Sequence, residues 1–167
     1  MRIEPLVPWV PTPEEILDDI VELLEIDTKS VFIDLGAGDG RVAIAAAKRG
    51  AFSIALEIDI VNCIIARDRA KLENTLVDVI QGDFETFPLN RVNRVFMYLY
   101  SSIHDRLKSK MIKELPKGAR IVTLDFPIPG WTPLKVKRCK TKSKTVRTLY
   151  LYIKGLSEKE EVWLKPT

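Results

Sequence analysis

Short apolar runs typical of buried strands alternate with helical segments along most of this 167-residue sequence. Helices are expected near residues 12–27, 41–50, 61–74 and 103–115. The strand-like runs are, in order, SVFIDLG, FSIALEID, LVDVIQGDF, RVFMYLY and ARIVTLDF. Strands that alternate with helices predict a parallel sheet with helices on both faces.

The pattern changes after residue 126, where VKRC and TLYLYIK are two strand-like runs without a helix between them. Two such strands predict an antiparallel hairpin at one edge of the sheet. We therefore expect an α/β fold: a Rossmann-like, doubly wound sheet of seven strands, mostly parallel, with an antiparallel C-terminal hairpin. The length suits one domain spanning residues 1–167.

Residues 1–13 form a proline-rich segment. Proline fixes φ and restricts the residue before it, so this segment is expected to be extended. Thr12 is expected to cap the helix that follows, with Pro13 at the first helical position and Glu15 completing a capping box.

The carboxyl ends of parallel strands meet at one edge of a sheet, which is where open α/β sheets bind ligands. Each of the five strand-like runs ends in a glycine loop, an acid or an aromatic residue. In chain order these are the loop that starts at Asp34, then Glu57, Asp83, Tyr98 and Asp125. Their shared position predicts a binding site at this edge.

The loop DLGAGDGR places Gly36, Gly38 and Gly40 at alternate positions, which indicates that a ligand approaches its backbone closely. A dinucleotide fingerprint has its third glycine one position later, where this chain has Arg41. The acids of the loop are also unfavourable neighbours for a pyrophosphate. A ligand that carries an ammonium group suits the loop better.

S-adenosylmethionine meets these requirements, because its amino group suits carboxylates and its carboxylate suits backbone N–H groups. Glu57 can accept hydrogen bonds from both ribose hydroxyls, and Asp83 can accept one from the adenine amino group. Phe84 or Ile58 can pack on the adenine ring. The structural alternative for either acid is a helix N-cap. The remaining cofactor contacts are expected from the loop residues Asp34, Gly36, Ala37, Gly38 and Gly40.

The order DLGAGDG, LEID and GDF resembles the class I, seven-stranded S-adenosylmethionine-dependent methyltransferases. A narrower resemblance adds the segments VPWVPTP, YLYSSIHDRLKSKM and DFPIPGWTP. Together they are similar to archaeal protein-lysine methyltransferases, relatives of the mitochondrial enzymes that methylate a lysine of the ATP-synthase c-subunit. The resemblance implies methyl transfer to the ε-amino group of exposed protein lysines, with broad specificity because no separate recognition domain is present.

The resemblance also implies roles for individual residues. Tyr98 matches an aromatic residue that lines the acceptor channel, although it can equally be a core aromatic. Asp125 is a candidate to orient the incoming amine, or else it caps a turn. Trp9 either covers the cofactor as part of a lid formed by residues 1–13 or packs on the first helix. Thr12 is a further candidate for cofactor contact beside its capping role.

Seven basic residues between Lys135 and Arg147, in a stretch without acids, support an alternative function. They suit an acidic partner, so the chain is alternatively an RNA or DNA methyltransferase. Against this, the segment MYLYSS lacks the Asn/Asp-Pro-Pro-aromatic signature of nucleic-acid amino methylation. An inactive scaffold and a small-molecule methyltransferase remain further alternatives.

The two cysteines, Cys63 and Cys139, have neither metal-ligand spacing nor a disulfide framework, so we expect no metal and a cytoplasmic location. No apolar run is long enough for a membrane span, so no membrane contact is expected. A monomer is the default expectation for the oligomeric state. His104, the single histidine, is expected to be a solvated helix residue without a role.

Overall fold

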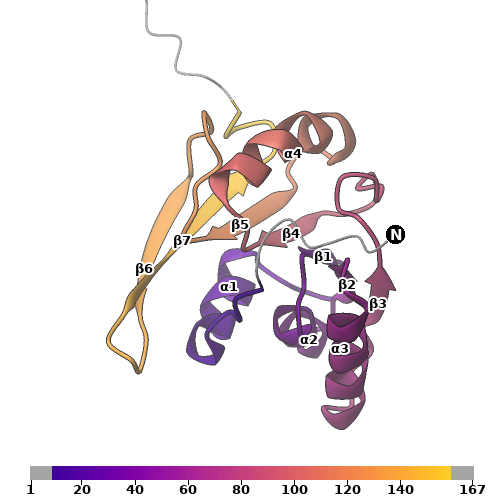
Figure 1. The fold of residues 1–167 in the computed structure, drawn as a ribbon. Coiled ribbons are helices and arrows are strands. Elements are labelled where there is room, and N and C mark those ends of the chain that lie inside the picture. The colour runs from indigo at the N-terminus through magenta and orange to yellow at the C-terminus, as the bar shows by residue number, and fades with distance from the viewer. Residues whose placement is uncertain (1–8, 159–167) are drawn as a thin grey trace, which may run out of the picture.

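The computed structural model describes residues 9–158, so residues 1–8 of the expected lid segment lie outside the described residues. One mixed sheet of seven strands has the order β3-β2-β1-β4-β5-β7-β6 (Figure 1). The strands are β1 (Val31–Leu35), β2 (Phe52–Glu57), β3 (Asp78–Gln81), β4 (Arg94–Met97), β5 (Arg120–Leu124), β6 (Lys135–Lys140) and β7 (Val146–Ile153). The helices are η1 (Glu14–Ile16), a single 3₁₀ turn, and α1 (Leu17–Leu23), α2 (Arg41–Lys48), α3 (Ile60–Leu72) and α4 (Ser101–Glu114).

The first five strands run parallel, and β7 and β6 complete the sheet in antiparallel pairing. The chain order reverses beside β1, which pairs with β2 on one side and β4 on the other. In a doubly wound sheet this reversal opens a crevice at the strand ends. The fold predicted from the sequence is confirmed, including the C-terminal hairpin.

Both faces of the sheet are buried, because successive apolar side chains of each strand point to opposite sides. In β1, Phe32 packs with α1 and α2, whereas Ile33 and Leu35 pack with α4. Figure 1 shows α1, α2 and α3 on one face and α4 on the other. The loops before β4 and after β5 complete the α4 face with Leu89 and Trp131.

The start of the first helix differs from the expected capping box. Thr12 makes no side-chain cap, and the helical segment opens with the 3₁₀ turn η1 after the extended Pro13. Thr12 and Glu15 instead accept hydrogen bonds from residues that are distant in the chain. The carbonyl oxygen of Thr12 accepts a hydrogen bond from Arg41 Nη1 at 2.8 Å, and Glu15 Oε1 accepts one from the Lys142 amide at 2.9 Å.

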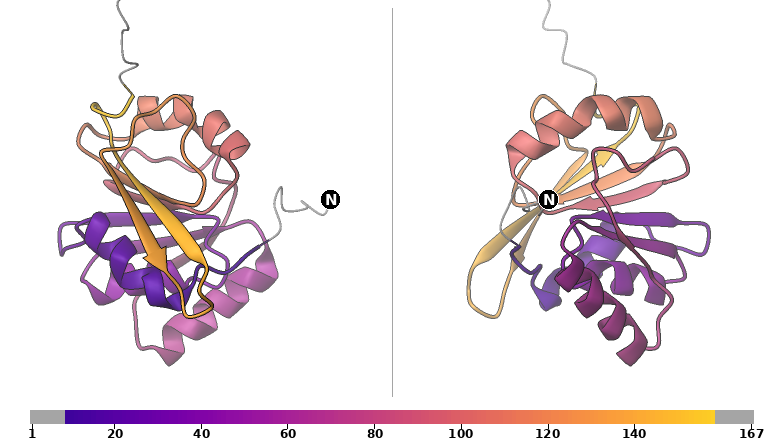
Figure 2. Two further views of the ribbon diagram at one scale, coloured as in Figure 1. Left: turned by 90° about the vertical axis from the view of Figure 1, so that its left-hand side faces the viewer. Right: turned by 45° about the vertical axis from the view of Figure 1, so that its right-hand side comes forward.

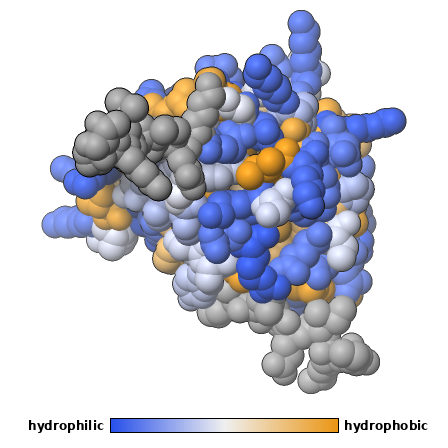
Figure 3. All heavy atoms as spheres, turned by 90° about the horizontal axis from the view of Figure 1, so that it is seen from above, coloured by the Kyte–Doolittle hydropathy of each residue, from blue (hydrophilic) through white to orange (hydrophobic). Residues whose placement is uncertain are grey.

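The C-terminal hairpin reaches past the ends of the parallel strands and lies beside α1 (Figure 2). Lys137 of β6 bonds to Asp19 of α1 at 2.5 Å, which holds the hairpin against the helix. Cys139 lies buried on the same face of the hairpin. The face seen in Figure 3 is mostly hydrophilic with small hydrophobic areas. Among residues 9–158, no helix combines the length and apolarity that crossing a membrane requires.

Candidate active site

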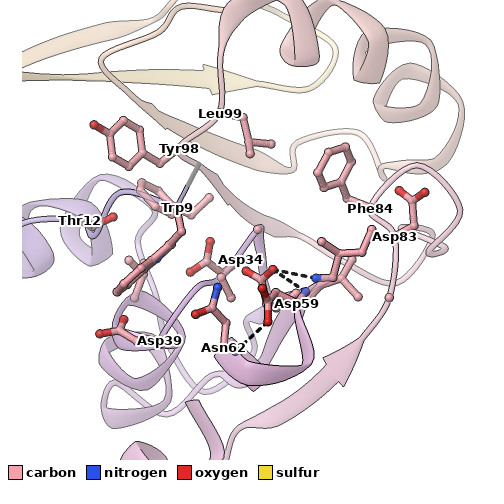
Figure 4. A pocket seen from close by; sticks show the side chains of 18 of the residues that line it. Trp9, Thr12, Asp34, Asp39, Asp59, Asn62, Asp83, Phe84, Tyr98 and Leu99 are labelled. Atoms are coloured by element: carbon pink, nitrogen blue, oxygen red, sulfur yellow. Dashed lines mark hydrogen bonds between the residues drawn. The ribbon is translucent and has the colours of Figure 1, made fainter. Parts of the chain in front are cut away.

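A cavity of about 450 Å³ opens at the carboxyl ends of β1, β2, β3 and β4, where the sheet reverses its order (Figure 4). The predicted residues that line it are Trp9, Thr12, Asp34, Gly36, Ala37, Glu57, Ile58, Asp83, Phe84 and Tyr98. Gly38, Gly40 and Asp125 are not among its lining residues. Eight of these ten residues lie at or just after the end of a strand that faces this edge, whereas Trp9 and Thr12 come from the segment before the first helix.

Glu57 organises the floor of the cavity through three backbone amides. Its Oε2 accepts a hydrogen bond from Gly38 N at 2.7 Å. Its Oε1 accepts from Ile58 N at 2.8 Å and from Asp59 N at 2.9 Å. Glu57 is 7% exposed, and its three hydrogen bonds tie the glycine loop to the end of β2. Asp59, not Glu57, caps α3 by accepting from Val61 N at 2.7 Å.

The indole of Trp9 lies directly on the backbone of Gly38. A Cβ atom built at Gly38 would stand 1.8 Å from Trp9 Nε1, so only glycine permits this approach. Gly38 also has a φ of 55°, in the left-handed region. Trp9 is 45% exposed and lines the cavity, which makes it a wall of the site rather than a staple buried on the first helix.

Asp34 is a buried acid without a compensating cation in the described part of the chain. It is 3% exposed, and no donor from residues 9–158 bonds to its carboxylate. Burial raises its pKa well above the usual value, and the nearby charges of Glu57 and Asp39 raise it further. A buried carboxyl that faces a cavity without a partner suits a cationic ligand group.

Asp39 has the opposite environment, although it is also buried. Burial works against ionisation, but hydrogen bonds and charge from Arg41, together with the charge of Arg69, lower the pKa of Asp39. Arg41 Nη2 lies 2.7 Å from Asp39 Oδ2, and Arg69 Nη1 lies 2.8 Å from the same oxygen. Glu14 extends the network to η1 through Arg69 at 2.6 Å. This network anchors the glycine loop to α3 and to the N-terminal segment.

The opposite side of the cavity carries Asp83 and Phe84, away from Trp9 and Tyr98 (Figure 4). Asp83 Oδ1 accepts from Glu85 N at 2.8 Å, which fixes the loop after β3. Ile58 and Phe84 supply apolar surface on the same side. An acceptor oxygen beside apolar surface suits a flat heteroaromatic ring that carries an amino group.

Tyr98 lines the other end of the cavity and is held from behind by charged residues. Arg147 of β7 donates a hydrogen bond to the Tyr98 hydroxyl and lies over its ring, with Cζ 5.2 Å from the centroid. Burial raises the pKa of the Tyr98 hydroxyl, so the ring stays neutral at physiological pH. Phe126 stacks near Tyr98 at 6.3 Å between centroids, and Tyr100 packs on Phe126 at 5.2 Å.

Asp125 belongs to this cluster rather than to the cavity wall. Its Oδ2 lies 2.6 Å from Arg147 Nη2, and its Oδ1 accepts from Thr148 N at 3.0 Å. Its φ of 60° is left-handed, which turns the chain at the end of β5. The carboxylate is therefore already engaged by the hairpin, and its expected part in orienting an amine stays a prediction.

Some lining residues were missed from the sequence. Leu99, Asn62 and Arg106 contribute to the cavity, and Arg147 supports it from outside. Asn62 follows the N-cap Asp59 by three positions, so the LEID signal could have found it. Arg147 carried no such signal, because its contact with Tyr98 spans 49 positions of sequence.

His104 is a correction to the sequence analysis, since it is fully buried rather than solvated. Its Nδ1 lies 3.4 Å from the carbonyl oxygen of Pro127, in the loop that carries Phe126. Burial lowers the pKa of His104 to about 4, so the imidazole is neutral at pH 7. The helix α4 turns this residue toward the loop after β5, which periodicity alone did not reveal.

Comparisons with known proteins agree with this geometry. The ANTKMT methyltransferase domain matches residues 34–135. A protein-lysine N-methyltransferase of Saccharolobus islandicus is 33% identical, covering 93% of this chain and 98% of that protein. The human lysine N-methyltransferase of the ATP synthase c-subunit is 29% identical, covering 76% of this chain and 55% of its own length. A crystal structure described as an RNA methyltransferase from Salinibacter ruber, in complex with S-adenosyl-L-homocysteine, aligns with a TM-score of 0.82.

The Salinibacter ruber chain is 31% identical and is covered completely, together with 94% of this chain. Fold, cavity and relatives together define a class I methyltransferase that uses S-adenosylmethionine as its methyl donor. Within this class the chain belongs to the ANTKMT methyltransferase-domain family. The family expected from the sequence motifs is thereby confirmed, and so is the cofactor.

Proposed function

We propose that this protein transfers a methyl group to the ε-amino group of exposed lysines on several proteins. The observation that carries the proposal is a cavity lined both by an unpartnered buried acid, Asp34, and by the neutral aromatic ring of Tyr98. The name of the Saccharolobus islandicus relative, a protein-lysine N-methyltransferase, supports the same acceptor.

The residues present fit S-adenosylmethionine, which supplies a methyl group on a sulfonium when it is bound. In this proposal Asp34 pairs with the amino group, and the glycine loop, from Gly36 through Ala37 and Gly38 to Gly40, faces the methionine part. Glu57 is assigned to the ribose hydroxyls. Its bonds to three amides support this role, because they fix both carboxylate oxygens at the cavity floor.

The remaining cofactor contacts are proposed for both rims of the cavity. Asp83 accepts from the adenine amino group, and Ile58 and Phe84 pack on the ring. Trp9 covers the methionine part from the N-terminal side, and Thr12 adds a contact beside it. The contact of Trp9 with Gly38 supports this lid role for the described end of the N-terminal segment.

The acceptor enters from the Tyr98 side. A free lysine amine has a pKa near ~10.4 and is mostly protonated at pH 7, so it must lose a proton to become a nucleophile. In this proposal the ring of Tyr98, with Phe126 stacked near it, excludes water, which lowers the pKa of an entering amine. The nearby Arg147 charge acts in the same direction. The lysine nitrogen then bonds to the methyl carbon as the carbon–sulfur bond breaks, and the proton leaves to solvent.

Broad specificity is proposed because the fold accounts for residues 9–158 without a separate recognition domain. We propose a single catalytic domain for residues 1–167. This chain covers about half of the human relative's length, so the substrate of that enzyme is not carried over. A cytoplasmic location is supported by the two free buried thiols, Cys63 and Cys139, and an archaeal source by the Saccharolobus islandicus relative.

Methylation of RNA is the second candidate, and one observation favours it. The Salinibacter ruber chain, covered along its whole length by this chain, is described as an RNA methyltransferase. The basic hairpin offers phosphate contacts for such a substrate. The two functions differ in the molecule that receives the methyl group, so identifying the methylated product distinguishes them.

Tritium-labelled S-adenosylmethionine and total lysate of the source cell separate these candidates. We expect protease, not nuclease, to release the label, and acid hydrolysis to yield methyl-lysines. Tyr98→Ala should lower turnover more than cofactor affinity, while Tyr98→Phe keeps the ring as a matched control. Label that only nuclease releases would contradict the lysine acceptor.

A further inference from the structure

Five basic residues of the C-terminal hairpin are exposed and form no ion pair with an acid of residues 9–158. Arg138, Lys140, Lys142 and Lys144, here called the basic strip, follow one face of β6 and then the turn that joins it to β7, whereas Lys135 lies on the other face of β6. Within residues 9–158, no carboxylate lies within 4.0 Å of any of these side-chain cations. The hairpin's other two cations, by contrast, are paired with acids of the same chain, Lys137 with Asp19 and Arg147 with Asp125.

The turn that carries the strip is held in one shape by its own hydrogen bonds. Thr141 is 8% exposed, and its hydroxyl bonds to Ser143 Oγ at 2.8 Å and to Thr145 Oγ1 at 2.7 Å. The Thr141 amide donates to the Thr145 carbonyl oxygen at 2.9 Å. A preorganised turn loses little conformational entropy on binding, so its charged side chains can bind a partner at low entropic cost.

Two of the contacts that anchor the hairpin lead to the walls of the cavity. At the turn, the Lys142 amide bonds to Glu15 at 2.9 Å, three residues from the lining residue Thr12. At the start of β7, Arg147 bonds to the lining residue Tyr98. These contacts tie the hairpin to the side of the site that carries Tyr98, the proposed acceptor entrance, and Figure 2 shows the turn of the hairpin extending beyond the other strands.

We propose that the basic strip is a docking surface for acidic segments that flank the target lysine of protein substrates. This inference rests on the proposed function. Complementary charge steers encounter and raises affinity without demanding one sequence, which suits an enzyme that accepts several proteins. The strip's exposed neighbours are aliphatic, Val136 at 50% and Val146 at 52% exposed. The aromatic ring opposite Val136 in the hairpin, Tyr150, is partly buried against the core. It is therefore poorly placed to stack on a base, which favours protein over nucleic acid.

The test measures binding and methylation separately. Two short fluorescein-labelled peptides carry one central lysine, flanked by glutamates in one and by glutamines in the other. The variant K140E/K144E reverses two charges of the strip. The control K71E/K113E makes the same change in net charge at exposed lysines of α3 and α4, which lie away from the turn of the hairpin (Figure 1). Fluorescence anisotropy gives peptide affinity at low and high salt, and parallel assays give kcat and KM.

We expect the full protein to bind the glutamate peptide more tightly than the glutamine peptide, with the difference lost at high salt. K140E/K144E should weaken the glutamate peptide by on the order of tenfold at low salt, raising KM and leaving kcat unchanged. The control should differ from the unmodified protein by less than about threefold. S-adenosylmethionine affinity should stay the same in both variants.

Equal loss in both variants would overturn the inference, because net charge alone would then explain it. So would equal affinity of the unmodified protein for the two peptides. A single-stranded RNA oligonucleotide that loses binding in K140E/K144E, while the glutamate peptide does not, would assign the strip to nucleic acid instead. A glutamate peptide that binds through the strip but is never methylated leaves the docking surface standing and contradicts the lysine acceptor.

Discussion

Replacing Gly38 by alanine tests whether the glycine loop holds the cofactor. Gly38 has a φ of 55°, and its amide donates to Glu57 Oε2 at 2.7 Å. A left-handed conformation costs an L-residue about 1–2 kcal/mol. A second cost follows because the new Cβ would meet Trp9 Nε1 at 1.8 Å, so either the indole or the loop must move.

The expected magnitude follows from what a shift of the loop would break. A hydrogen bond to a charged group contributes about 1.5–3 kcal/mol. Since about 1.4 kcal/mol corresponds to a tenfold change in affinity, Gly38→Ala should weaken S-adenosylmethionine binding by about 10- to 100-fold. Its free energy of unfolding should fall by about 1–2 kcal/mol from the backbone conformation alone.

Gly118→Ala provides the matched control. Gly118 has a φ of 88°, and no atom lies within 4 Å of a Cβ built there. It should share the loss of stability but leave cofactor affinity unchanged. Isothermal titration calorimetry with S-adenosylhomocysteine and urea unfolding of both variants measure the two quantities. Unchanged affinity in Gly38→Ala, or an equal loss in Gly118→Ala, would refute the assigned role of the loop.

Three further predictions concern single groups. Glu57→Gln should weaken cofactor binding at least tenfold in calorimetry, because the carboxylate serves three amide donors; an unchanged affinity would remove its ribose role. The raised pKa of Asp34 destabilises the cofactor-free fold as the pH rises above 3.8, so Asp34→Asn should raise the free energy of unfolding at pH 7. The same substitution should abolish the proton release that accompanies cofactor binding, which calorimetry in buffers of different ionisation enthalpy measures. His104 has a pKa of about 4 against 6.5 when unfolded, so it should cost the fold about 3 kcal/mol as the pH falls from 6.5 to 4; a profile in urea that His104→Leu does not flatten would contradict this.

Much of the fold was predictable because its signals are local. Apolar runs bounded by glycine and acid define β1 and β2, and the missing helix before β7 defines the antiparallel hairpin. The glycine spacing, the acids at the strand ends and the resemblance to a known family together placed ten predicted residues around one cavity. The predicted capping box does not form, because Arg41 donates to the Thr12 carbonyl oxygen and the Lys142 amide donates to the Glu15 carboxylate. Both donors are distant in the chain, so no local pattern indicated them.

The amino-acid sequence by itself determined the order of strands and helices, the parallel sheet and the edge at which ligand-binding residues gather. These features follow from hydrophobic period and from residue types at adjacent positions. Only the tertiary structure decided that Arg147 supports Tyr98, that Asp125 is paired with the hairpin and that His104 is buried. Such contacts join residues distant in the chain, so they depend on how the finished sheet brings the hairpin and α4 together, which no local pattern encodes.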